Sequence, residues 1–407
     1  MYYLSRGQVP HKRHTQFRKP DGGLYAEELF GTEGFSGRAS LLYHHTPPTQ
    51  THRVEKSRDA RIERWTEDEA GAHRHHLVKA GALEPAGDAI SGRIPLFTNP
   101  DVTFGVVRPA AGMDRFYRNG EADELYYVHE GHGTLETVFG PIEYRPGDYL
   151  VIPIGTTYRL TPGPQAQRML WLECPSPIEA PRRYRNEVGQ LLEHAPYCER
   201  DIRPPAEMAA HTESGEFVVE VKIRGKLTAY HYAQHPFDLV GWDGYLYPYA
   251  FNIEDFEPIT GRVHQPPPVH QTFQARNFVV CSFVPRKFDY HPLAIPAPYN
   301  HSNINSDEVI YYVAGNFMSR RGVEISSFTV HPGGIAHGPH PGTVEASIGK
   351  EATAELAVMI DTFHPLYLTS QAAALDDPAY PYSWMPPADA DAAARELAER
   401  GPEAFPD

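Results

Sequence analysis

The chain has 407 residues, of which 41% are hydrophobic and 12% aromatic, and 37 basic against 52 acidic residues give it a formal net charge of −15. This length and composition predict a globular protein with two or three domains. The acidic balance argues against nucleic-acid and anionic-membrane partners, because both require clustered lysine and arginine.

Membrane insertion and export are not expected either. The sequence has no run of about 18 apolar residues, and its first residues lack the apolar core of a secretory signal. The three cysteines (Cys174, Cys198 and Cys281) are scattered and form neither a disulfide framework nor a zinc pattern. We therefore expect a cytoplasmic protein.

Four segments follow one another along the chain. Residues 1–90 are polar, rich in histidine and irregular, which predicts an extended arm with loops. Residues 91–230 and 231–385 each combine short apolar runs with frequent glycine and proline, the pattern of many short strands. Residues 386–407 are rich in alanine, with acids early and arginines late, and they alone clearly predict a helix.

One motif of two halves occurs in both strand-rich segments, with the same spacing inside each half. The first copy consists of Tyr117, Asn119, Glu124 and Gly131, followed by Pro153, Gly155 and Tyr158. The second copy consists of His301, Asn303, Glu308 and Gly315, followed by Pro332, Gly334 and His337. An internal repeat decides the architecture. We predict an all-β bicupin: a first jelly-roll barrel over 91–230, a second over 231–385, the irregular arm before them and the short helix after them.

The second copy carries residues that bind metals. Side chains at i and i+2 of a strand share a face, so His301 and Asn303 should both point into the barrel. Glu308 would return from the neighbouring strand, and His337 would complete the set. Two imidazoles and one carboxylate leave open coordination positions, which is typical of non-haem Fe(II) enzymes that activate oxygen. Zinc accepts the same ligands but has no redox chemistry.

The first copy differs at both histidine positions. Tyr117 and Tyr158 are poor ligands for Fe(II), because a phenol has a pKa of about 10. We therefore expect the first barrel to lack a metal site and to serve as structural support.

The assembled residues resemble the homogentisate 1,2-dioxygenase family over most of the chain. The resemblance lies in the segments LYAEELFG (24–31), HPFDLVGWDGYLYPYAFNIEDF (235–256), PAPYNHSNINSDE (296–308) and AHGPH (336–340). It implies an Fe(II) bicupin of aromatic and tyrosine catabolism that opens the ring of a hydroxylated arylacetate with O2 and assembles as a trimer or hexamer. By this resemblance the iron ligands are His301, Glu308 and His337.

The same resemblance assigns two further histidines. His264 matches the family's candidate base, and His270 is the alternative for that role because the prolines between them blur the alignment. His331 matches a histidine that helps to hold the substrate.

Three positions near the predicted site bear on the substrate. Phe317 stands where the family has a substrate-binding tyrosine, and a phenylalanine cannot donate a hydrogen bond. His340 replaces an aspartate. Arg320, near the barrel mouth, offers a partner for a substrate carboxylate. Fold, metal and reaction type therefore transfer better than substrate identity.

Two other functions remain open from the sequence. One is a cupin isomerase or hydrolase with another divalent metal. The presence of Asn303 where such cupins usually have a histidine argues against it. The other is a bicupin that binds a ligand without catalysis, against which the complete ligand set argues. A metal assay combined with O2 uptake separates the three.

Overall fold

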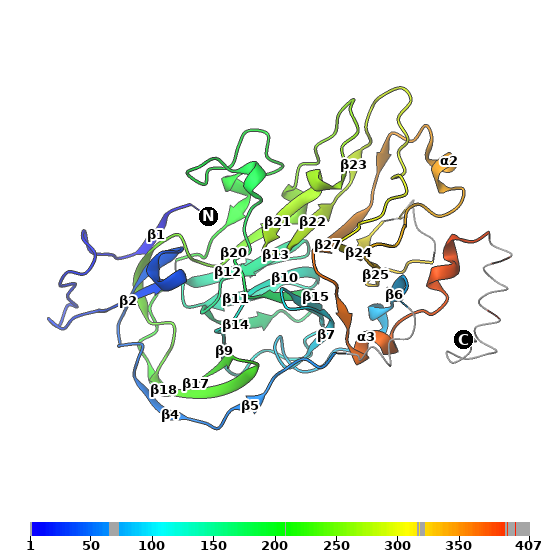
Figure 1. Ribbon diagram of the computed structural model, residues 1–407. Coiled ribbons are helices and arrows are strands. Elements are labelled where there is room, and N and C mark those ends of the chain that lie inside the picture. Colours follow the sequence, from blue (N-terminus) through cyan, green and yellow to red (C-terminus); the bar gives the residue numbers. More distant parts are fainter. Residues whose placement is uncertain are drawn as a thin grey trace. The chain divides into compact units, whose positions relative to one another are not determined.

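A computed structural model describes residues 2–64, 73–207, 209–315, 317 and 322–386, together with 389 and 395 (Figure 1). The chain divides into two compact units. Unit 1 comprises residues 1–62, 85–93 and 105–255, and unit 2 comprises residues 63–84, 94–104 and 256–407. Most of the predicted helix at 386–407 lies outside the described residues. Among the described residues, no helix is long and apolar enough to cross a membrane.

Unit 1 consists of antiparallel sheets with one parallel strand pair. Its strands are β1 (Leu4–Gly7), β2 (Ala26–Gly31), β3 (Ala39–His44), β4 (Thr51–Val54), β5 (Arg58–Asp59), β9 (Phe116–Asn119), β10 (Asp123–Glu130), β11 (Gly133–Thr137), β12 (Gly140–Tyr144), β13 (Asp148–Ile152), β14 (Thr157–Pro162), β15 (Arg168–Cys174), β16 (Ile202–Arg203), β17 (Ser214–Ile223), β18 (Lys226–Gln234), β19 (Leu239–Gly244) and β20 (Tyr249–Asn252). They form the orders β1-β19-β3-β2, β16-β20-β13-β10-β15 and β12-β11-β14-β9-β17-β18-β4, with β5 beside β18 and β17 parallel to β9. Strands β7 (Arg93–Thr98) and β8 (Thr103–Val107) carry residues of both units.

Unit 2 has a six-stranded sheet in the order β21-β22-β27-β24-β25-β6 and a two-stranded sheet of β23 and β26. These strands are β6 (His76–Val78), β21 (Gln271–Ala275), β22 (Phe278–Phe283), β23 (Arg286–Lys287), β24 (Asp307–Ala314), β25 (Phe328–His331), β26 (Ala352–Thr353) and β27 (Leu356–Thr362); a further strand, β28 (Tyr367–Leu368), pairs with β7. The apolar runs of β22 and β27 are largely buried, as expected for strands inside a sheet.

Helices are short throughout the described residues. The α-helices are α2 (Thr343–Ser347) and α3 (Ser370–Ala374), and the 3-10 helices are η1 (Glu33–Phe35), η2 (Ala80–Ala82), η3 (Arg182–Tyr184), η4 (Glu199–Asp201), η5 (Ile253–Asp255), η6 (Pro267–His270) and η7 (Tyr380–Trp384). The chain is thus an all-β bicupin, as the repeated motif predicts.

The division of the chain differs from the predicted segments. Residues 1–90 supply β1 to β6, so they pair within sheets and do not form a separate arm. Residues 231–255 belong to unit 1, because β19 pairs with β3 and β20 pairs with β13. The boundary therefore falls at 255/256 and not at 230/231. These pairings join segments far apart in sequence, which local patterns do not reveal.

The two copies of the motif have the same strand register. Tyr117 of β9 lies opposite Tyr158 of β14, and His301 lies opposite His337 in an isolated antiparallel bridge. The turns that precede Tyr158 and His337 each contain a glycine with positive φ, +82° at Gly155 and +81° at Gly334. Residues that carry a side chain rarely adopt this backbone conformation, which explains the glycine in both turns. The repeat is therefore structural and not only a sequence pattern.

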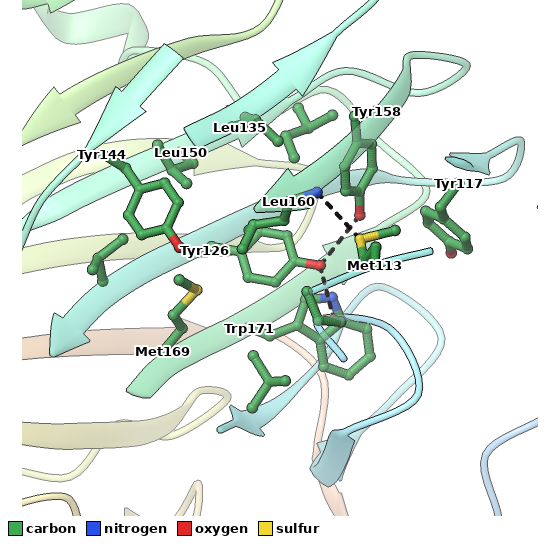
Figure 2. Packing of buried hydrophobic residues seen from close by; sticks show 14 of the residues in the cluster. Met113, Tyr117, Tyr126, Leu135, Tyr144, Leu150, Tyr158, Leu160, Met169 and Trp171 are labelled. Atoms are coloured by element: carbon green, nitrogen blue, oxygen red, sulfur yellow. Dashed lines mark hydrogen bonds between the residues drawn. The ribbon is translucent and has the colours of Figure 1, made fainter. Parts of the chain in front are cut away.

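In unit 1, a buried arginine lies beside the motif residues Glu124 and Tyr158. The guanidinium of Arg93 forms an ion pair with the Glu124 carboxylate, with nitrogen and oxygen 2.7 Å apart, donates to the Tyr158 hydroxyl at 3.0 Å, and also contacts the Tyr126 hydroxyl. Tyr158 in turn donates to Glu124 at 2.8 Å. Figure 2 shows Tyr126 and Tyr158 with their hydroxyl groups turned toward each other in the buried core. Burial, the largest cause, together with the charge of Glu124 raises the pKa of Tyr158 well above its usual value. Its phenol thus stays protonated.

A second buried ionic group in unit 1 makes its stability depend on pH. The imidazole of His44 lies 2.6 Å from Asp238 and 2.9 Å from Glu28. Burial alone would lower the pKa of His44, but the hydrogen bonds to the two carboxylates outweigh it and raise the pKa from 6.5 to about 9. The folded-state pKa thus exceeds the unfolded one, so the stabilisation is complete below about pH 6.5 and is lost as pH rises through about 9.

This shift corresponds to about 3 kcal/mol of unfolding free energy. We expect the stability advantage of the wild type over His44→Gln to shrink by that amount between about pH 6 and about pH 10, in urea unfolding followed by circular dichroism. The half-exposed His52, which pairs with Glu216, gives the control variant His52→Gln, for which little change is expected. An advantage that stays constant with pH would contradict the assignment of a charged His44.

Candidate metal centre

Glu308 reaches the centre from the middle of the six-stranded sheet of unit 2. It is the second residue of β24, where it lies opposite His331 of β25 on one side and Asp361 of β27 on the other. Glu308, Ile310 and Tyr312 all line one cavity. This spacing of two is the alternation of side chains along a strand. The sheet therefore fixes the direction of the carboxylate.

The two histidines are held by their backbone bridge. The His301 N–H donates to the His337 carbonyl at 2.8 Å, and the His337 N–H donates to the His301 carbonyl at 2.9 Å. The centres of the two rings are 4.2 Å apart. One nitrogen of each ring lies 3.4 Å from a Glu308 carboxylate oxygen, and one ligand atom from each of the three residues lies within 4.8 Å of the others. The three predicted ligands are thus brought together.

The hydrogen bonds of the two rings show that this group suits a cation. Nδ1 of His301 lies 3.1 Å from the Tyr299 carbonyl, and Nδ1 of His337 lies 3.3 Å from the Ile335 carbonyl. Each Nδ1 must carry the proton to donate to a carbonyl, so in the neutral ring Nε2 presents a lone pair. The buried Nε2 of His337 has no hydrogen-bond partner. Two lone pairs facing a carboxylate fit a divalent metal with two His and one carboxylate ligand.

His331 lies behind this group and not in the cavity. It is fully buried, its Nδ1 lies 2.8 Å from Glu308 Oε1, and its Nε2 lies 3.2 Å from the Tyr380 hydroxyl. Its ring also stacks on that of His337 at 4.3 Å. The sequence predicts a substrate contact for His331. The position instead suits a residue that orients the carboxylate and one imidazole, as partners behind metal ligands do.

The charge of the centre is concentrated on one carboxylate. Burial opposes ionisation of Glu308, but the neighbouring imidazoles of His301, His331 and His337 hold its pKa well below the usual range. Asp361 behaves oppositely, because burial and the charge of Glu308 hold its pKa well above the usual range. One ionised and one protonated carboxyl group therefore lie side by side.

A cavity of about 500 Å³ opens onto the centre and has mostly apolar walls. Of the residues predicted for the site, five line it: His264, His270, His301, Glu308 and Phe317. Asn303 lines it as well, in agreement with the expectation that it shares a face with His301. A cavity of this size accommodates a small aromatic molecule.

The two histidines considered as a base differ in their surroundings. His264 is exposed, and its Nδ1 lies 2.8 Å from a carboxylate oxygen of Asp289. This contact places the proton on Nδ1 and leaves Nε2 able to accept one. His270 is buried, and burial followed by the charge of Arg286 lowers its pKa to about 3. His264 is therefore the better base.

Phe317 and two other predicted substrate residues have different outcomes. Phe317 packs edge-on against Tyr312, with ring centres 4.4 Å apart. His340 is buried outside the cavity lining, where its Nε2 lies 2.7 Å from the Ser383 hydroxyl and its ring stacks on Trp384 at 4.5 Å. Its position does not match the predicted substrate contact, because the chain after His337 turns it toward η7. Arg320 lies outside the described residues.

Asp361 and Arg286 are among the polar residues of the cavity that sequence reasoning missed. The Oδ1 atom of Asp361 is buried without a hydrogen-bond partner. An acidic residue inside the apolar run LAVMIDT is the signal that would have marked Asp361. Arg286 lies three residues after the end of the buried strand β22 and gave no comparable signal.

A second group of possible ligands, in unit 1, fits a metal poorly. His211, Glu213 and His235 also place ligand atoms within 4.8 Å of one another. However, Nδ1 of His235 accepts a hydrogen bond from the Phe237 N–H at 3.1 Å, so in the neutral ring Nε2 carries the proton and offers no lone pair. Burial and then the charge of His211 lower the pKa of His235 to about 4. The ring is thus neutral, but its one lone pair already accepts a hydrogen bond and is not free for a metal.

Comparisons with known proteins show which proteins the chain as a whole is similar to. The family described as "Homogentisate 1,2-dioxygenase N-terminal" matches residues 5–253. A Saccharolobus solfataricus protein that carries the name "Putative dioxygenase" is 44% identical over 94% of this chain and 99% of its own length. The homogentisate 1,2-dioxygenase of Bradyrhizobium diazoefficiens is 26% identical over 86% of this chain and 83% of its own.

Solved structures show more distant likenesses. A cupin 2 conserved barrel domain protein from Leptotrichia buccalis is 11% identical, with a TM-score of 0.32 over 72% of this chain and 98% of its own. A glyoxylate-induced protein from Pseudomonas aeruginosa is 13% identical, with a TM-score of 0.32 over 78% of this chain and 97% of its own.

Proposed function

Because the chain belongs to the homogentisate 1,2-dioxygenase family, we propose that it is an Fe(II)-dependent enzyme that opens the ring of homogentisate or a related hydroxylated aromatic acid with both atoms of O2. The observation that carries the proposal is the convergence of His301, Glu308 and His337, of which His301 and Glu308 line the cavity and His337 turns its orphaned Nε2 to the carboxylate. Bound Fe(II) would supply the redox chemistry that activates O2.

The residues of the chain have distinct tasks in this proposal. His301, Glu308 and His337 would hold the iron, and His331 keeps Glu308 and His337 oriented from behind. His264, oriented by Asp289, would accept a proton from a ring hydroxyl, which makes the ring richer in electrons. The apolar walls of the cavity hold the ring and exclude water.

Oxygen consumption tests the proposal. Anaerobically purified protein reconstituted with Fe(II) should bind about one iron per chain and take up O2 when homogentisate is added. With isotopically labelled O2, mass spectrometry should find both oxygen atoms in a ring-opened product. Removal of the iron with a chelator should stop the uptake. An iron-loaded protein that consumes no O2 with homogentisate or any other hydroxylated aromatic acid would refute the proposed reaction.

Other expectations stay predictions. A homo-oligomer, either a trimer or a hexamer, follows from the family resemblance, and light scattering in solution tests it. The cytoplasmic location rests on the sequence alone.

A further inference from the structure

Arg286 and His270 line the cavity from neighbouring segments of unit 2, and their polar atoms are incompletely paired within the described residues. Arg286 begins β23, three residues after the end of β22, and His270 ends η6, directly before β21. Since β21 pairs with β22, these segments form one hairpin, and both side chains line the cavity that contains Glu308. The metal centre and these two groups therefore share one cavity.

Within the part of the chain that the structure describes, Arg286 forms no ion pair with a carboxylate. Its hydrogen bond runs from Nη1 to the Val284 carbonyl at 3.3 Å, and its guanidinium lies 5.5 Å from the centre of the Phe283 ring. Burial lowers the pKa of Arg286, while Glu355 and Asp289 oppose this through their charges. Asp289, however, already accepts hydrogen bonds from His264 and from the Gln265 N–H. Arg286 stays charged, so most of its five N–H donors are left for another acceptor.

His270 is an uncharged donor with no acceptor. The side chain is only 5% exposed, and its Nδ1 is buried without a hydrogen-bond partner. A buried polar atom left unpaired costs free energy, so such atoms usually meet a partner that binds later. A neutral imidazole can place its proton on Nδ1 and donate it. Arg286 and His270 together therefore offer charged and neutral donors to one anion.

The sheet sets the separation between this pair and the metal centre. Phe283, three residues before Arg286, lies opposite Ala357 of β27, whereas Glu308 lies opposite Asp361 of the same strand. Four residues of strand span roughly 13 Å, measured between backbone positions. The side chains of both groups extend into the space between. An occupant that reaches both must be elongated, with its anionic group away from the end that meets the metal ligands.

We propose that Arg286 and His270 form an anion subsite that takes the carboxylate of an aromatic acid, with the acid group on a side arm and the hydroxylated ring toward His301 and Glu308. The inference rests on the proposed function for the nature of the ring. In this proposal Arg286 and His270, and not Arg320 as predicted from the sequence, bind the carboxylate of the substrate. The subsite selects acids and excludes neutral phenols of the same size, because an unpaired guanidinium remains when a neutral ligand binds.

Binding without turnover tests the subsite. The full-length protein, reconstituted with Fe(II) under anaerobic conditions, is titrated calorimetrically with homogentisate and with its methyl ester, which has the same ring but no charge. We expect Arg286→Met to weaken homogentisate binding roughly 30-fold or more, and His270→Phe to weaken it roughly tenfold. The ester should bind each variant within about threefold of the wild type, which also shows that the variants are folded.

Two further variants sharpen the result. Arg286→Lys keeps the charge but loses the fork of donors, so it should recover part of the affinity for the acid. Arg262 is an exposed arginine outside the cavity lining, and Arg262→Met makes the same charge change without an expected effect. The inference is overturned if homogentisate binds the wild type and Arg286→Met equally, if acid and ester lose affinity by the same factor, or if the wild type binds neither.

The failure of this inference can be told apart from that of the proposed function. Acid binding that depends on Arg286 but is not followed by O2 uptake in air would leave the subsite intact and remove the proposed reaction. Conversely, O2 uptake with an unchanged KM in Arg286→Met would support the reaction and remove the subsite.

Discussion

Replacing His337 by alanine is expected to reduce iron affinity by at least about 100-fold and to abolish O2 uptake. Substitutions of residues that only support a metal ligand already cost roughly 10- to 100-fold in affinity, so the loss of a ligand should cost more. His337 also carries the buried Nε2 that faces Glu308 without a hydrogen-bond partner. Iron content after gel filtration and O2 consumption with homogentisate measure the two effects.

The control for this variant is His291→Ala. His291 is exposed, lies in the same unit and does not line the cavity, so its removal changes the histidine count but not the centre. It should keep the iron content and the O2 uptake of the wild type. A His337→Ala protein that retains about one iron per chain and full uptake would show that the metal is held elsewhere, and the arrangement of ligands proposed above would fall.

Replacing Arg93 by methionine should destabilise unit 1 by about 3–5 kcal/mol, although no catalytic group is touched. The side chain of Arg93 is 8% exposed and that of Glu124 is fully buried, so the substitution leaves a buried carboxylate without its cation. The remaining hydrogen bond from Tyr158 to Glu124 places the expected effect near the lower end of the range. Thermal unfolding should show a midpoint lower by roughly 6–12 °C.

A double variant separates the charge effect from lost packing. Arg93→Met combined with Glu124→Leu removes both charges, and replacement of a buried ion pair by apolar side chains is often neutral or stabilising. The double variant should therefore recover much of the stability that the single variant loses. Arg115→Met is the control, because Arg115 is half-exposed and its pair with Glu220 should contribute less than about 1 kcal/mol. If the double variant is no more stable than Arg93→Met, the loss of stability does not come from the unpaired Glu124 carboxylate.

The repeated motif explains why the sequence was sufficient for the fold class and for the convergence of His301, Glu308 and His337. Short-range spacing places Glu308 on a strand, and the match of the two copies predicts the pairing of His301 with His337. The same comparison marks Tyr117 and Tyr158 as positions that differ. It gives no sign of Arg93, which lies outside the motif and reaches the buried Glu124 only through a tertiary contact.

Residues beside the ligands were predicted less well. His331 was placed at the substrate, yet it lies behind Glu308 and is hydrogen-bonded on both ring nitrogens. His340 follows the last ligand by three residues, but the chain turns it onto Trp384 and away from the cavity. A histidine near a ligand in sequence has several possible directions, and sequence distance does not distinguish between them.

The sequence by itself determined the strand-rich class, the repeat, and the two histidines and one glutamate that converge, because strand alternation and identical spacing are local properties. Only the tertiary structure decided which polar side chains share the cavity. Asp361, Arg286 and His270 come from separate segments, and antiparallel pairing of β24 with β27 and of β21 with β22 brings those segments to one cavity. Burial then keeps Asp361 and His270 uncharged and leaves one polar atom of each unpaired among the described residues. Burial depends on the whole fold and not on neighbours in the chain.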